Sequence, residues 1–177
     1  ESAGKSTLVE NLALAYNTNY VSEVGRETCE YAGGEELMIA EDLIENLIRQ
    51  KDEVRKAAKF SNRILFVDTD ALTTGFYCNL LLQDGEEKRG LVQLADSIHF
   101  TNEWDLVLFL EPEGVDFVQD GTRNEEIRAE RKKYSEMLKE IFLLNGVKIA
   151  CLEGDYLERF NQAKKMIENE LKIVTVF

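Results

Sequence analysis

Apolar and polar positions along this chain follow two alternating patterns. Short, mostly apolar runs are typical of strands, and those at 64–67, 105–110 and 147–152 have the composition of buried parallel strands. A further short strand is expected at 20–22. Apolar residues recur at helical spacing in between and predict helices at 8–16, 35–60 with a break left open near Gln50, 72–82, 88–99, 125–144 and 155–171. Helices that alternate with buried strands predict an α/β fold of three layers.

The composition favours a single domain over residues 1–177. The chain has one proline and no Gly/Ser/Pro-rich stretch at which a linker could divide it. Its net charge of −13 opposes binding to a nucleic-acid backbone. The apolar runs are shorter than the ~18–20 residues that span a bilayer, and no signal peptide opens the chain, so we expect a cytoplasmic protein with no membrane partner.

The thiols and the single histidine give no sign of a metal site. Cys29, Cys78 and Cys151 stand far apart with no CxxC pair, and His99 has no nearby partner in the sequence. We therefore expect the cysteines to be structural. Any phosphate site in so acidic a chain must depend on a few cations and on backbone N–H groups.

The strongest motif opens the chain. Gly4-Lys5-Ser6-Thr7 is the second half of the pattern GxxxxGK[ST] and stands before a predicted helix. The first glycine would lie two residues before Glu1, so the chain is expected to begin inside its own motif. The N–H groups around Ala3–Ser6 can surround a phosphate at a helix N-terminus, Lys5 would reach the β- and γ-phosphates, and Ser6 would bind Mg²⁺. Thr7 caps or packs. The alternative is a tetrapeptide that only caps a surface helix.

Two carboxylates end the apolar run at 64–67. Asp68 follows that run as a Walker-B acidic residue does and would bind Mg²⁺ directly or through its neighbours. Asp70 would emerge at the same carboxyl edge of the sheet, where open α/β folds bind their ligands. A plain turn at the end of the strand is the alternative for Asp70.

A glycine hinge beside an arginine predicts a lid at about 115–131. Arg123 follows Gly121 and is the first choice for an arginine that reaches the transferring phosphate, with Arg128 assigned to the nucleotide and Asp120 to the substrate. A solvated helix face is the alternative, above all for Arg131 and the two lysines that follow it.

The segment Ser22–Glu27 is a candidate acceptor site. Glu23 could accept a proton from the attacking hydroxyl or hydrogen-bond a ribose, and Arg26 could hold a substrate or phosphate oxygen. Surface ion pairing is the alternative for both. Aromatic residues near strand ends could stack on a flat ring but more often pack at the rim of the core, so none is assigned to a base: Phe76, Tyr77 and Trp104.

Four segments, in this order and spacing, resemble the ribosylnicotinamide kinase domain of the NadR-type bacterial NAD-biosynthesis proteins over nearly the whole chain: ESAGKST, SEVGRE, LFVDTDALTT and FVQDGTR. The resemblance implies a P-loop kinase fold with a central parallel sheet, ATP and Mg²⁺ at the phosphate loop, and phosphorylation of the 5′-hydroxyl of nicotinamide riboside to nicotinamide mononucleotide. Family members often carry a fused adenylyltransferase domain, which these residues do not contain.

The resemblance assigns roles to residues by motif. Gly4, Lys5, Ser6 and Thr7 carry over as the nucleotide loop, Asp68 as the acidic residue at the strand end, Arg123 as the lid arginine, and Glu23, Arg26 and Asp70 as the acceptor side. Lys5, Asp68, Arg123 and Glu23 would then be the catalytic residues.

Two other functions stay open on the sequence alone. One is a nucleoside or nucleotide kinase with a different acceptor, and the other is a P-loop ATPase or switch module with no small acceptor. A guanine-specific switch is disfavoured, because Asn102-Glu103-Trp104-Asp105 lacks the lysine of N-K-x-D and precedes its strand.

Overall fold

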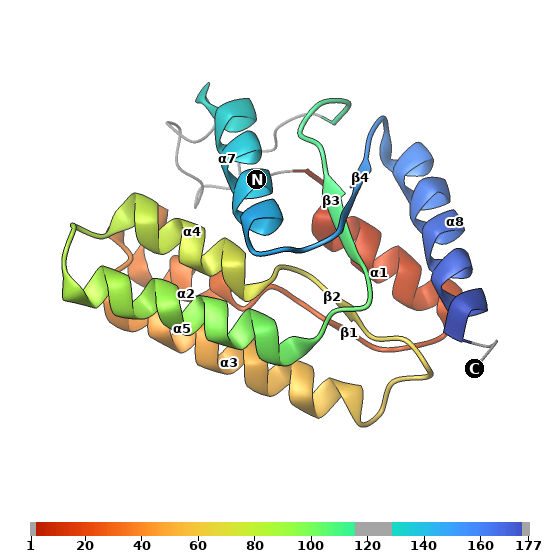
Figure 1. Ribbon diagram of the computed structural model, residues 1–177, viewed down its shortest axis with the longest axis horizontal. Helices are drawn as coiled ribbons and strands as arrows, with labels where there is room; N and C mark the ends of the chain where they lie inside the picture. Colours follow the sequence, from red (N-terminus) through yellow and green to blue (C-terminus); the bar gives the residue numbers. More distant parts are fainter. Residues whose placement is uncertain (1–2, 116–128, 175–177) are drawn as a thin grey trace.

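The computed structural model describes residues 3–115 and 129–174, in which helices and strands alternate as the sequence predicts (Figure 1). In chain order the elements are α1 (Lys5–Tyr16), β1 (Tyr20–Val21), α2 (Gly25–Ala32), η1 (Glu35–Leu37), α3 (Ala40–Ala58), β2 (Phe66–Val67), α4 (Ala71–Leu81), α5 (Glu86–Asn102), β3 (Val107–Leu110), α7 (Arg131–Leu144), β4 (Ile149–Leu152) and α8 (Tyr156–Val174).

The described strands form two parallel pairs. β1 pairs with β2, with Tyr20 opposite Phe66, and β3 pairs with β4 from Val107 opposite Ile149 onward. The predicted α/β fold with parallel strands is confirmed, although within the described ranges the strands make two pairs and not one continuous sheet. An apolar cavity of about 260 Å³, lined by residues of both β2 and β3, lies beside these pairs. We call it the inter-strand cavity.

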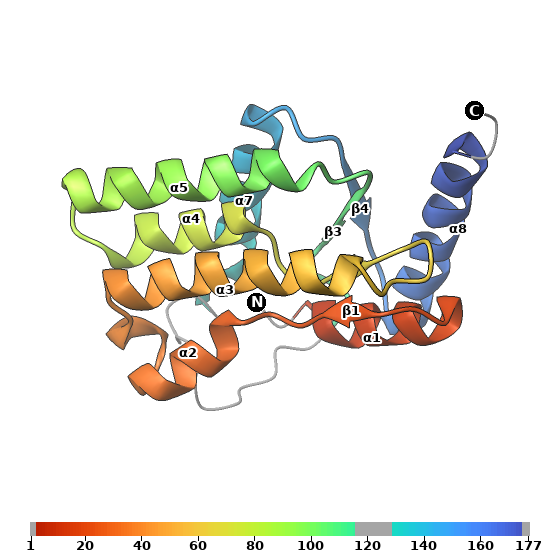
Figure 2. The same ribbon diagram turned by 90° about the horizontal axis from the view of Figure 1, so that it is seen from below.

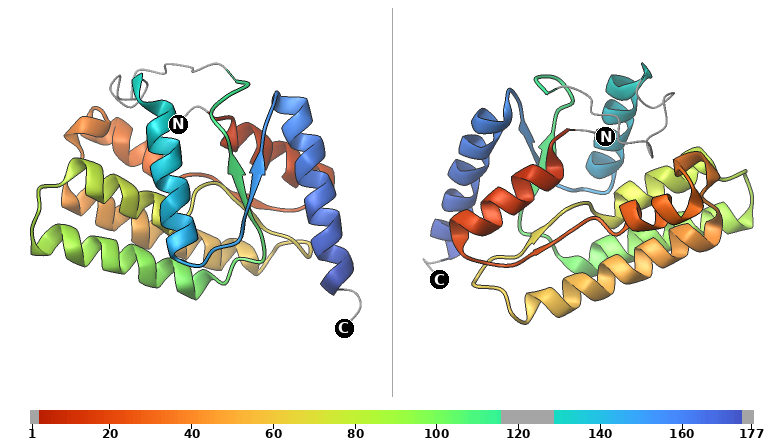
Figure 3. Two further views of the ribbon diagram at one scale, coloured as in Figure 1. Left: turned by 45° about the horizontal axis from the view of Figure 1, so that its top comes forward. Right: turned by 180° about the vertical axis from the view of Figure 1, so that it is seen from behind.

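Helices cover the strands on both sides and so make three layers (Figure 3). On one side α1 and α8 pack against the strands, and Leu12, Leu152 and Ala163 are almost fully buried there. On the other side Leu72 of α4 and Phe142 of α7 pack with Phe109 of β3. Burying side chains of this size stabilises the fold by about 1.5–3 kcal/mol each.

Helices α3, α4 and α5 lie side by side and extend the molecule beyond the strands (Figure 2). Leu43 and Leu47 stand four positions apart on the inner face of α3, and each is 1% exposed. On α4, a Cβ at Gly75 would lie only 3.0 Å from the Cβ of Ala95, so the glycine allows α4 and α5 to approach closely. Leu43 and Leu47 of α3 belong to one buried apolar cluster with Ala95 of α5, and this cluster holds the three helices together.

The structure differs from the predicted helices at one place near the site. Residues 25–32 form α2, where the sequence predicts no helix, and its C-cap Gly33 has a left-handed conformation with φ 91°. With eight residues, α2 is shorter than the window in which a helical period can be recognised. Helix α3 starts at Ala40 and passes through Gln50 without a break.

Candidate functional site

The phosphate loop, residues 3–6, turns directly into the first helix. Gly4 is the N-cap of α1 with φ 79°, a left-handed conformation that glycine adopts most easily. The ring of Tyr156 leaves no room for a side chain there, because a Cβ at Gly4 would lie 2.6 Å from it. A glycine N-cap offers no side chain to the N–H groups of the first turn, so these groups remain suited to an anion.

Ser6 and Asp68 meet although 62 residues separate them. The Ser6 hydroxyl donates to Asp68 Oδ2 at 2.6 Å, and Asp68 is 2% exposed. A hydroxyl and a carboxylate side by side at a phosphate loop are hard oxygen ligands that suit Mg²⁺, which usually keeps several waters and takes few protein ligands. The pair therefore fits the predicted metal position. Within residues 3–115 and 129–174 no cluster of three or more His, Cys, Asp or Glu side chains could hold a metal.

A second cavity of about 110 Å³ lies next to the loop and has Lys5, Glu23, Arg26 and Asp70 in its wall. We call it the acceptor pocket. Lys5, Glu23 and Asp70 also line the inter-strand cavity, so the two spaces adjoin at these residues. The structure thus brings together the predicted nucleotide and acceptor residues.

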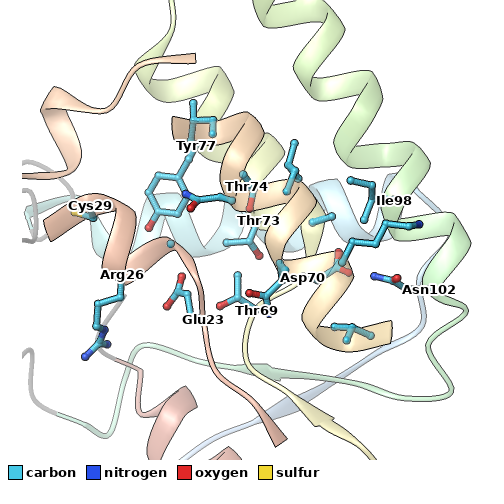
Figure 4. Close-up of a pocket in the computed structure, with 18 of the residues that line it drawn as sticks. Glu23, Arg26, Cys29, Thr69, Asp70, Thr73, Thr74, Tyr77, Ile98 and Asn102 are labelled. Atoms are coloured by element: carbon cyan, nitrogen blue, oxygen red, sulfur yellow. The ribbon is translucent and has the colours of Figure 1, made fainter. Parts of the chain in front are cut away.

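The predicted acceptor residues do not all face the same way. Figure 4 shows the side chains of Glu23, Thr69 and Asp70 close together, whereas the exposed Arg26 points away from them. Glu23 lies at the boundary of both cavities, which suits a group that acts between nucleotide and acceptor. The predicted role of Arg26 in holding a substrate stays a prediction, and its position restricts that role to the rim.

The turn that carries Glu23 is held by α3. The Gln50 side chain accepts from the Val24 N–H at 2.9 Å and donates to the backbone oxygen of Asp68 at 3.2 Å. Asn46, one turn earlier, packs 3.4 Å from the position of a Cβ at Gly25. Gln50 therefore ties the turn after β1 to the end of β2. Sequence reasoning missed this link because the bonded residues are far apart in the chain.

Asp70 caps a helix and also holds two neighbouring side chains in place. It is the N-cap of α4, and its Oδ1 accepts from the Leu72 N–H at 2.9 Å. The same oxygen lies 2.7 Å from His99 Nδ1, while the Trp104 indole donates to Oδ2 at 2.6 Å. Both oxygens are thus engaged. Direct contact between Asp70 and a substrate stays a prediction, and His99 and Trp104 are site neighbours that the sequence did not reveal.

The predicted lid at about 115–131 is described at its two ends. Asp120, Arg123 and Arg128 lie outside the described residues. Arg131 is described at the start of α7: it donates to the Val115 carbonyl at 3.2 Å and lines the inter-strand cavity. Lys132 pairs with Glu113 in an exposed ion pair, as expected for a solvated helix face.

Charged contacts tie α7 to the loop after β3. Lys139 forms an ion pair with Glu111, and this hydrogen bond raises the pKa of Lys139. The pKa of Glu113 is lowered, first by a hydrogen bond from its own backbone N–H and then by Lys132. Both contacts favour the charged forms at neutral pH.

The thiols lie where structural cysteines are expected. Cys29 and Cys78 are buried, and all three cysteines are free. Burial raises the pKa of the Cys78 thiol to about 11, so it stays protonated and unreactive at neutral pH. No helix among the described residues has the length and apolar character needed to cross a bilayer.

An α/β fold of parallel strands, with a glycine-capped helix start beside a serine that donates to a buried aspartate, defines a P-loop nucleotide-binding protein. A comparison with protein-family models agrees: the family described as AAA domain matches residues 1–159. This match spans most of the chain, and the chain belongs to that family.

Comparison with individual proteins identifies more specific relatives within this family. The chain is 31% identical over 171 residues, 95% of its length, to the trifunctional NAD biosynthesis/regulator protein NadR of Salmonella typhimurium, and 31% identical over 170 residues to NadR of Escherichia coli. It spans 40% of the length of each. A crystal structure of a NadR protein in complex with NR superposes with a TM-score of 0.79 at 25% identity, over 96% of this chain and 48% of that one. The predicted resemblance is thereby confirmed.

Proposed function

We propose that this chain is an ATP-dependent kinase that phosphorylates the 5′-hydroxyl of nicotinamide riboside and yields nicotinamide mononucleotide. The observation that carries the proposal is the Ser6–Asp68 pair at the phosphate loop, next to a pocket that Lys5, Glu23 and Asp70 line. The similarity to NadR, including a structure determined with NR, supports nicotinamide riboside as the acceptor. We also propose that the protein acts in the cytoplasm, as the sequence predicts.

Each residue of the nucleotide end has a physical task in this proposal. The N–H groups at the start of α1 and the Lys5 ammonium bind the phosphates, and Ser6 and Asp68 hold Mg²⁺. The bound ion supplies neutralisation of charge on the phosphate oxygens. The chain itself contributes position and charge, with no covalent step through a side chain.

Glu23 is the best candidate for the group that takes the proton of the acceptor hydroxyl. Asp68 already accepts from Ser6 and from the Thr69 hydroxyl, whereas Glu23 lines both cavities. A carboxylate within hydrogen-bond reach of the attacking hydroxyl orients it and receives its proton. Arg123, outside the described residues, is proposed as the lid cation, with Arg128 on the nucleotide and Asp120 on the substrate.

The test measures phosphorylation of a panel of nucleosides by the protein with ATP and Mg²⁺, for the parent chain and for Lys5→Ala. We expect nicotinamide riboside to have the highest kcat/KM, and Lys5→Ala to lower it on the order of 100-fold or more. Lys59→Ala, at an exposed position after α3, is the matched control and should leave turnover unchanged.

Three results would contradict the proposal in different ways. Equal turnover by the parent and Lys5→Ala proteins would show that the phosphate loop is not the nucleotide site. Preference for another nucleoside would retain the kinase and change its acceptor. Phosphate release that does not depend on any acceptor would indicate an ATPase or switch module.

A further inference from the structure

Arg159, in the first turn of α8, is a buried cation that donates to backbone carbonyls within the described part of the chain. It is 1% exposed, and its guanidinium donates to the carbonyl oxygens of Ala3 at 2.6 Å, Glu111 at 2.7 Å, Glu113 at 2.5 Å and Gly154 at 2.7 Å. Burial lowers the pKa of Arg159, although a guanidinium still stays protonated at neutral pH. A buried positive charge held by carbonyl dipoles is costly to keep, which points to a task beyond packing.

The four carbonyls belong to three loops that would otherwise be independent. Ala3 belongs to the phosphate loop, Glu111 and Glu113 follow β3, and Gly154 follows β4. Arg159 and Ala3 are 156 positions apart in the chain. One side chain therefore fixes the phosphate loop to the loops at the ends of both strands of a parallel pair.

Two close approaches support the same arrangement. A Cβ at Gly114 would lie 2.6 Å from the Gly154 carbonyl oxygen, and a Cβ at Gly4 would lie 2.6 Å from the Tyr156 ring. Both glycines have positive φ, 91° and 79°. The loops around Arg159 thus lie in close contact, through backbone at Gly114 and through the Tyr156 ring at Gly4, and small movements of one would disturb the others.

The contact with Ala3 also sets the direction of a donor. In a planar trans peptide the carbonyl and the following N–H point in opposite directions. Because the Ala3 carbonyl points at Arg159, the N–H of Gly4 points away from it. This N–H stands at the N-terminus of α1, where a phosphate is expected.

We propose that Arg159 is a positioning residue of the nucleotide site, which presents the Gly4 N–H to the phosphates and adds a fixed positive charge beside them. The inference rests on the proposed function only in placing a nucleoside triphosphate at the phosphate loop. In a chain with a net charge of −13, a buried cation beside the loop raises the affinity for an anion that the rest of the surface repels.

The test uses isothermal titration calorimetry with a non-hydrolysable ATP analogue and Mg²⁺, and separately with nicotinamide riboside. Arg159→Lys keeps the charge and loses the planar fork, and Arg159→Gln loses both. We expect the dissociation constant for the analogue to rise about tenfold for Arg159→Lys and more for Arg159→Gln, with the riboside constant within about twofold. The matched control is Arg89→Gln, an arginine whose side chain is 67% exposed, and it should change neither constant.

Two outcomes would overturn the inference. If the Arg159 variants bind the analogue as tightly as the parent does, Arg159 does not position the nucleotide site. If they lose affinity equally for the analogue and the riboside, the role of Arg159 is purely structural. If the parent protein binds no triphosphate at all, the proposed function fails first, so the two failures are distinguishable.

A measurement on the parent protein keeps the inference testable if both variants fail to fold. The Gly4 amide resonance in a ¹⁵N-correlated NMR spectrum should shift strongly when the analogue binds, and its hydrogen exchange should slow. The N–H of Gly90, a glycine within α5, is the internal control and should not respond. An unmoved Gly4 resonance on saturation with the analogue would contradict the inference.

Discussion

The phosphate loop and the acceptor pocket adjoin, yet they are built in different ways. The loop is one short stretch, in which Gly4, Lys5 and Ser6 are consecutive and one hydrogen bond from Ser6 reaches Asp68. The walls of the pocket come from several helices and are held by side-chain bonds between residues 26 to 34 positions apart. The difference teaches that the predicted nucleotide site uses consecutive backbone groups, which Arg159 holds in place from 156 positions away, whereas the predicted acceptor site is assembled from side chains of several helices. Substitutions should therefore separate the two affinities.

The largest effect is expected at Gly4. Gly4→Val would force a β-branched residue into a left-handed conformation and against the Tyr156 ring, so the start of α1 must move. We expect the affinity for the Mg²⁺-bound ATP analogue to fall on the order of 100-fold or more, with riboside binding nearly unchanged. Calorimetry with each ligand measures both. Gly90→Ala is the control, because nothing lies within 4 Å of its added Cβ. Equal loss of both affinities would show that the regions are not separable.

Removing the Ser6 hydroxyl should have the next largest effect. Ser6→Ala deletes one expected metal ligand and leaves the Asp68 carboxylate without that donor. We expect kcat to fall about 30- to 100-fold and the Mg²⁺ concentration for half-maximal rate to rise. Initial rates over a magnesium series provide the measurement. Ser6→Thr, which keeps a hydroxyl, should recover most of the activity, and a magnesium profile that is the same for Ser6→Ala and the parent would contradict the assignment.

Asp70→Asn tests the acceptor side of the comparison. The amide keeps one accepting oxygen and replaces the other with an NH2 donor, so it cannot serve the Leu72 N–H, His99 and Trp104 together, and the free energy of unfolding should fall by about 2 kcal/mol. We expect KM for the riboside to rise about tenfold and KM for ATP to stay within about twofold. Because Trp104 is the single tryptophan, its fluorescence spectrum should shift as well.

The control for that change is Asp84→Asn, whose side chain is 98% exposed. It should leave the two KM values and the tryptophan emission unaltered. A higher KM for ATP in Asp70→Asn, with no change for the riboside, would place Asp70 on the nucleotide side of the boundary.

The smallest effect is expected at Gln50, which contacts both regions. Gln50→Leu loses the bonds to the Val24 N–H and the Asp68 carbonyl, and should lower the free energy of unfolding by about 1 kcal/mol. Both affinities should weaken together by about threefold. Chemical denaturation and calorimetry give the two readouts, and Gln93→Leu at an exposed position on α5 is the control. An effect on one ligand alone would show that Gln50 belongs to one region only.

Several features of the site could be predicted because they are local. The Gly4–Thr7 motif identifies a phosphate loop, and the apolar run before Asp68 identifies a strand end that points to the same edge. The positions of the strands were recognised for a similar reason, since buried parallel strands are short apolar runs. No helix is predicted over α2 because its eight residues are fewer than the window in which a helical period can be recognised.

The sequence by itself determined the class of protein, the nucleotide loop and the carboxylate that meets it, because consecutive residues and short periodic patterns encode them. Three sets of contacts follow only from the tertiary structure. Asp70 is hydrogen-bonded to His99 and Trp104, and Gln50 links the turn after β1 to the end of β2. Arg159 donates to carbonyls of three loops. These bonds join residues that are up to 156 positions apart, and no local pattern marks which distant partners will meet. They form when packing of the helices on the strands brings buried polar groups together, and each such group must then find a partner.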